Sequence, residues 1–146
     1  DCLGTGNEVF RKMFGNNDYS FIAGRIKFLM INTNAIEYDY SEPVPDFDFL
    51  ETEVKKDSAL FDRTIVCMHA APYSEQFNNN VAKPFNHYMQ FYPGLMFCLY
   101  GHGHHTEEHD IFENGTIYYE VASVEKREYR IFTITPKGYS NEVISF

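Results

Sequence analysis

The sequence has few cysteines, and their number and spacing argue against a protein held together by disulfide bonds. The three cysteines are Cys2, Cys67 and Cys98, an odd number without a Cys-x-x-Cys spacing. Such a set does not predict a disulfide framework. Because Cys67 and Cys98 lie inside apolar runs, we expect both to be free thiols that pack as small hydrophobic side chains.

Long apolar stretches and cationic side chains are also scarce. No apolar run approaches the length of a membrane span, and no signal peptide is visible. Only 12 lysines and arginines stand against 21 acidic residues, so the formal net charge is −9. This balance argues against nucleic acid or an anionic membrane surface as a partner. It is compatible with a metal site, because bound cations invert the local field.

The length and apolar content predict one globular domain over residues 1–146. With 146 residues and 44% apolar side chains, the chain is long enough to bury a core and is not expected to be disordered. The sequence begins at Asp1 instead of methionine, and we therefore expect it to be trimmed from a longer protein.

Apolar periodicity predicts alternating helices and strands over residues 1–100. The expected elements are a helix capped by Asn7 and stopped by Gly15, strands 19–22 and 26–32 around Gly24, a helix opened by Asp46, strand 64–68, a helix opened by Pro84, and strand 95–100. The two apolar strands 64–68 and 95–100 are typical of strands covered on both faces.

After residue 105 the period changes to two, which predicts antiparallel hairpins. One hairpin joins residues 110–113 to 116–121 through Asn114-Gly115, and the other joins 129–135 to 141–146 through residues 136–138. The expected fold class is α/β, with a mixed sheet, flanking helices and a four-strand antiparallel meander at the C-terminal side.

The most informative motif is Gly101-His102-Gly103-His104, which directly follows strand 95–100. We expect the glycines to let the backbone turn sharply, so that both imidazoles leave the carboxyl edge of the strand as a metal clamp. Open α/β sheets place their chemistry at that edge. The alternative is an ordinary loop.

A second candidate ligand, His69, follows strand 64–68 in the run Met68-His69-Ala70-Ala71-Pro72. Neutral imidazole suits zinc, manganese and iron, so His69, His102 and His104 are the predicted metal ligands. The alternative for His69 is a hydrogen-bonded histidine at a strand end. Tyr73 follows Pro72, and we expect it to line a substrate pocket beside this site.

The remaining polar candidates have simpler interpretations. We expect His105 at the surface or behind the metal ligands, His109 in solvent, and His87 on a helix surface. The acidic group is expected to be a solvated loop and helix start instead of a calcium site; it comprises Glu37, Asp39, Glu42, Asp46 and Asp48.

The order of these motifs resembles the calcineurin-like metallophosphoesterases. Strand-His69-Ala-Ala-Pro72, a helix, and strand-Gly101-His102-Gly103-His104 are similar to the last two metal motifs of that family. The trailing hairpins and the stretch from Phe14-Gly15 to residues 28–33 also agree, so the resemblance covers essentially the whole chain.

The resemblance implies half of an α/β/β/α sandwich with a dinuclear centre of manganese, iron or zinc. His69 and His102 would bind one metal and His104 the other. In the family, a metal-bound hydroxide attacks the phosphorus of a phosphate ester.

The sequence departs from the family in its N-terminal motifs. It contains no Asp-x-His triplet, no Gly-Asp-x-x-Asp and no Gly-Asn-His, so the bridging carboxylate and the proton-donating histidine are missing. Asp1 would directly follow a lost Gly-Asn-His. We therefore expect the C-terminal portion of a phosphoesterase that is inactive as this chain and holds at most one weakly bound metal ion.

Two other functions remain open at this point. The chain is alternatively a binding or structural module that keeps the fold without the chemistry, or a mononuclear zinc protein. If half of a sandwich is missing, the uncovered sheet exposes apolar side chains, and we expect a homodimer through that face.

Overall fold

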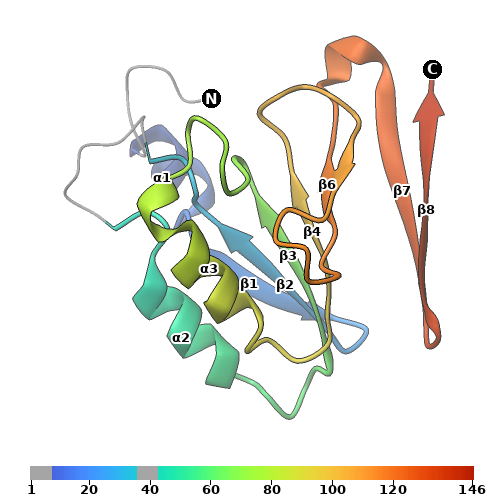
Figure 1. Ribbon diagram of the computed structural model, residues 1–146. Helices are drawn as coiled ribbons and strands as arrows, with labels where there is room; N and C mark the ends of the chain where they lie inside the picture. Colours follow the sequence, from blue (N-terminus) through green and yellow to red (C-terminus); the bar gives the residue numbers. More distant parts are fainter. Residues whose placement is uncertain (1–7, 36–42) are drawn as a thin grey trace.

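The computed structural model describes residues 8–35 and 43–146, and a six-stranded mixed sheet lies at its centre (Figure 1). The strand order is β1-β2-β3-β4-β6-β5, in which β2, β3, β4 and β6 run parallel and both edge strands run antiparallel to their neighbours. A separate hairpin, β7–β8, follows at the C-terminal end. The α/β fold class with an antiparallel C-terminal hairpin is confirmed.

The elements have the following bounds: α1 (Glu8–Phe14), β1 (Tyr19–Ala23), β2 (Ile26–Ile31), α2 (Phe47–Lys55), β3 (Arg63–Met68), the 3₁₀ turn η1 (Asn79–Val81), α3 (Ala82–Met89), β4 (Leu95–Tyr100), β5 (Glu108–His109), β6 (Tyr118–Glu120), the 3₁₀ turn η2 (Val124–Lys126), β7 (Glu128–Thr135) and β8 (Gly138–Ser145). The predicted opening of α2 is confirmed, because the Asp46 side chain accepts a hydrogen bond of 3.0 Å from the amide of Phe49.

Two layers cover the central strands. Helices α2 and α3 connect successive parallel strands and lie on one face of the sheet (Figure 1), where Leu50 and Phe85 pack with Leu29, Val66 and Cys98. The opposite face packs against β7–β8. There the rings of Phe97 and Phe132 stack with centroids 4.5 Å apart, and Tyr139 joins the same cluster. The sequence prediction that the apolar strands are covered on both faces is therefore confirmed for β3 and β4.

A buried ion pair fastens α2 to β2. Lys27 Nζ lies 2.7 Å from Glu53 Oε2, and both side chains are at most 5% exposed. Lys56 Nζ contacts Glu53 Oε1 at 2.8 Å, and the Ser20 hydroxyl also donates to this carboxylate. Burial alone would raise the pKa of Glu53, but the hydrogen bonds from Lys27, Lys56 and Ser20 together lower it to about 2.

The four-strand meander predicted for the C-terminal side is wrong. Strand β6 joins the main sheet parallel to β4, and only β5 pairs with it in an antiparallel sense. The predicted strand 110–113 is a turn instead. The Asp110 carboxylate accepts hydrogen bonds from the amides of Asn114 and Gly115, which closes a loop between His109 and Tyr118.

The other expected elements agree with the structure where it describes them. The N-terminal helix and the β1–β2 hairpin are present, whereas Cys2, the cap residue Asn7 and the acidic residues Glu37, Asp39 and Glu42 lie outside the described residues. Cys67 and Cys98 are free, as predicted, and burial raises their thiol pKa values to about 11 and about 12. Within the described ranges, every helix is too short or too polar to cross a membrane.

Candidate functional site at the carboxyl edge of the sheet

Three parallel strands end at one edge of the sheet and bring distant segments together there. His69 follows β3, Gly101 follows β4, and Glu120 is the last residue of β6. The Gly101 amide donates to the His69 carbonyl at 3.1 Å, and the Val121 amide donates to the Tyr100 carbonyl at 2.9 Å. The two histidine segments therefore share the edge that the sequence predicted.

The structure brings together two of the three predicted metal ligands. The rings of His69 and His102 are in edge-to-face contact, with centroids 5.2 Å apart and planes at 70°. His102 Nε2 also lies 3.3 Å from the Glu75 carboxylate, on the loop that follows Tyr73. Two imidazole rings thus lie together just after the carboxyl ends of β3 and β4.

The ring contact between His69 and His102 does not include His104. Its side chain is exposed. Over residues 8–35 and 43–146, the donor atoms of His69, His102 and His104 do not form a group within 4.8 Å of one another. A metal-binding role for the three histidines stays a prediction, and the contact between His69 and His102 is its geometric basis.

The turn in the histidine motif is made by the histidines and not, as expected, by the glycines. His102 and His104 have φ values of 65° and 59°, in the left-handed region, whereas Gly101 and Gly103 do not. Tyr73, across the site, has a φ of 69°. Such backbone strain at non-glycine residues is concentrated at functional sites, because the surrounding structure must hold it.

Gly103 serves a different purpose. A Cβ atom at this position would collide with Oε1 of Glu120, while a Cβ at Gly101 would meet open space. Gly103 therefore lets the loop backbone approach the Glu120 carboxylate closely, which a larger residue would prevent.

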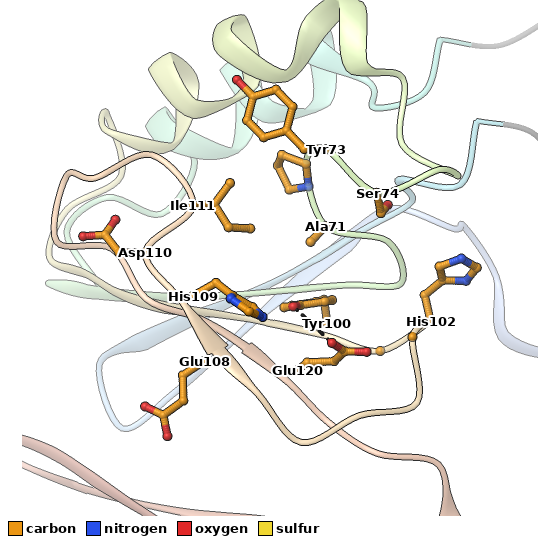
Figure 2. Close-up of a pocket in the computed structure, with 13 residues that line it drawn as sticks. Ala71, Tyr73, Ser74, Tyr100, His102, Glu108, His109, Asp110, Ile111 and Glu120 are labelled. Carbon is orange, nitrogen blue, oxygen red and sulfur yellow. Dashed lines mark hydrogen bonds between the residues drawn. The ribbon is translucent and has the colours of Figure 1, made fainter.

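A cavity of about 620 Å³ opens at this edge. Its wall includes Tyr73, His102, His109 and Glu120. Tyr73 thus shares a cavity with the histidine motif, and a substrate-binding role for it stays a prediction. Its ring packs against Phe112 with centroids 5.5 Å apart, and its amide donates to the Asn79 side chain at 2.8 Å. Figure 2 shows the His109 ring directed toward Glu120 and Tyr100, whereas Glu108 points away from them.

Glu107, His109 and Glu120 form a donor group that sequence reasoning missed. One ligand atom from each lies within 4.8 Å of the other two. His109 Nε2 is 2.9 Å from Glu107 Oε2, and the Glu120 amide donates to the Glu107 carbonyl at 2.9 Å. The expectation that His109 is solvated is correct for its exposure, 45% of the side chain, but not for its neighbours.

The Glu120 carboxylate is buried, with 7% of its side chain exposed. It accepts hydrogen bonds of 3.3 Å from the Tyr100 hydroxyl and from the His105 amide, and the exposed His105 ring lies 3.9 Å away. Burial and then the Glu120 charge raise the pKa of Tyr100, so its hydroxyl stays a donor. The His105 side chain is 67% exposed, which agrees with the surface position expected for it.

The remaining histidine and the neighbouring acid have partners elsewhere. His87 is exposed and its ring packs on Phe91 at 4.8 Å, which agrees with the expected helix surface. Glu108 contacts Arg130 at 3.0 Å and so belongs to the β7–β8 side.

No protein-family model matches the chain, and no curated protein matches it.

Proposed function

We propose that this chain is the C-terminal portion of a metal-dependent phosphoesterase, with His69 and His102 among its metal ligands. The observation that carries the proposal is the contact between these two imidazoles at the carboxyl ends of adjacent parallel strands, where His102 also faces a cavity. The order of the histidine motifs, which resembles the calcineurin-like family, supports the assignment of substrate class.

The donors at this site fit one metal ion better than two. His69 and His102 supply two neutral nitrogen donors, and His104 is not grouped with them. His102 Nε2 lies 3.3 Å from the Glu75 carboxylate, and with Nε2 bound to that carboxylate the metal-binding atom of His102 would be Nδ1. A bound divalent ion would supply Lewis acidity and an acidified water.

The chain's own residues would position a phosphate ester. The cavity beside His102 is walled by Tyr73 and the small residues Ala71 and Pro72, which leave room for an ester group. The two imidazoles supply no negative charge, and without a bridging carboxylate nothing would screen the repulsion between two adjacent cations. We therefore expect weak binding of at most one metal ion at this pair and no useful hydrolysis by this chain.

Nuclear magnetic resonance of the imidazole nitrogens during a Zn²⁺ titration tests the proposal, with signals assigned through His69→Gln and His102→Gln. We expect the His69 and His102 signals to shift together and inorganic phosphate, the product of monoester hydrolysis, to shift them further. The His87 signals serve as the control and stay fixed. If the His69 and His102 signals do not respond to Zn²⁺, the metal-ligand assignment is wrong. If they respond to Zn²⁺ but not to phosphate, the module binds metal without phosphoesterase character.

A further inference from the structure

We infer that Glu107, His109 and Glu120 bind one divalent transition-metal ion, with Zn²⁺ as the best match, at a second site on the same edge of the sheet. This site uses none of the histidines proposed above as phosphoesterase ligands. It is therefore independent of that proposal.

The donor set has the chemistry of a catalytic-type zinc site. One imidazole and two carboxylates are ligands that Zn²⁺ takes, and three protein donors leave a fourth position open. Donor atoms of a tetrahedral zinc site lie about 3.3 Å apart, given metal–ligand bonds near 2.0–2.1 Å. The three donor atoms here lie within 4.8 Å of one another, with His109 and Glu107 already 2.9 Å apart, so small side-chain movements complete the geometry.

The two buried glutamates of the described residues differ in how their charge is balanced. One of these two, Glu53, is neutralised by Lys27 and Lys56. Across the described part of the chain, Glu120 forms no salt bridge with a lysine or an arginine, although its side chain is only 7% exposed and Glu107 lies close by. A buried carboxylate without a cationic partner is costly. A divalent cation would balance Glu107 and Glu120 together.

The loop is shaped around the Glu120 carboxylate. Gly103 leaves the space that Oε1 of Glu120 occupies, and the Tyr100 hydroxyl and the His105 amide hold the carboxylate in place. These contacts are of the kind that orient metal-bound carboxylates. His109 and Glu120 both line the cavity (Figure 2), so an ion held between them would lie at the cavity wall.

The test is competition of the full chain with a chromophoric chelator for Zn²⁺, accompanied by the visible absorption spectrum of the Co²⁺-loaded protein. Glu107→Gln and His109→Ala change exposed side chains, so both variants are expected to fold. Each should weaken Zn²⁺ binding at this site by at least about 100-fold, the upper limit for loss of a mere supporting contact, and remove the tetrahedral Co²⁺ bands. Glu113→Gln and His87→Ala are matched exposed controls that should leave both readouts unchanged.

The outcomes separate this inference from the proposed function. Loss of a Zn²⁺ equivalent in Glu107→Gln and His109→Ala, with that equivalent retained in His102→Ala, supports the second site. Binding that is lost in His102→Ala and unchanged in Glu107→Gln and His109→Ala overturns the second site and leaves the phosphoesterase ligands intact. Binding that none of these variants changes overturns both.

Discussion

At the scale of single residues, the Gly-His-Gly-His motif combines two tasks. His102 and His104 adopt the left-handed backbone that the sequence led us to expect of the glycines. Gly103 instead provides space for the buried Glu120 carboxylate. The sequence predicts a tight turn at a strand end, but it cannot show that Gly103 makes room for Glu120, because that carboxylate lies seventeen positions away along the chain.

Gly103→Ala and Gly101→Ala distinguish these roles. We expect Gly103→Ala to displace Glu120 and to weaken Zn²⁺ binding at the second site by at least about tenfold, because it disturbs the position of a ligand. Gly101→Ala places its Cβ in open space and should bind as the parent chain does. The measurement is chelator competition for both variants. Equal affinities would show that Gly103 does not shape the site.

One feature of the sequence indicates the group of Glu107, His109 and Glu120, namely the spacing of its first two members. In an extended segment, Glu107 and His109 project to the same side, and Glu120 lies in the segment predicted to pair nearby. Placing the hairpin turn at Asn114-Gly115 shifted the register, because the Asp110 side chain holds a longer loop. Side-chain hydrogen bonds of this kind are not visible in apolar periodicity.

At the scale of elements, helices and buried strands followed from the sequence, whereas the partners of short strands did not. β3 and β4 have continuous apolar runs, and Asp46 marks the start of α2. β6 has only three residues, all of them buried, and so short a run does not indicate whether its neighbour is parallel or antiparallel. Its place beside β4 is set by tertiary packing.

The buried ion pair between Lys27 on β2 and Glu53 on α2 is expected to stabilise the folded chain. Glu53→Gln leaves Lys27 buried with a weakened partner, and we expect the free energy of unfolding at pH 7 to fall by about 3 kcal/mol. Glu51→Gln is the matched control on the same helix, because Glu51 and its partner Lys55 are both exposed, and it should change stability by less than about 0.5 kcal/mol. Urea unfolding measures both. Equal effects would contradict the role of the buried pair.

The Glu53 carboxylate makes the free energy of unfolding depend on pH. Its pKa is about 2 in the folded chain against 4.5 for the ordinary group, so the folded state binds fewer protons. The stabilisation is therefore complete above pH 4.5 and is lost as the pH falls toward 2, by about 3 kcal/mol in total. Urea unfolding between pH 6 and pH 3 should show this decline in the parent chain and in Glu51→Gln. The decline should be reduced in Glu53→Gln, and an identical pH dependence in that variant would refute the assignment.

At the scale of the whole molecule, the main sheet leaves apolar side chains uncovered at its β1 edge. The hairpin β7–β8 packs on Phe97 and Tyr119, while Tyr19 and Phe21 of the edge strand β1 are 44% and 46% exposed. Phe21 stacks on Phe28 with centroids 4.9 Å apart. The sequence led us to expect exposed central strands. Within the main sheet, Tyr19 and Phe21 of the edge strand are exposed instead, because the C-terminal hairpin covers the central strands; the hairpin in turn exposes Tyr129, Ile131 and Val143.

The β1 edge is where we expect two copies to associate, as the sequence suggested for an uncovered sheet face. Light scattering coupled to size-exclusion chromatography should show a dimer that Phe21→Glu converts to a monomer. Phe91→Glu changes an equally exposed ring away from this face and should leave the dimer intact. A parent chain that is monomeric at every concentration would contradict the prediction.

Anomalous X-ray diffraction at the zinc absorption edge would show whether divalent metal ions bind where β3, β4 and β6 end. Crystals grown with Zn²⁺ should show one strong peak among Glu107, His109 and Glu120 and a weaker one beside His69 and His102. Anomalous maps without a peak at either position, from crystals of the chain at saturating Zn²⁺, would contradict the account.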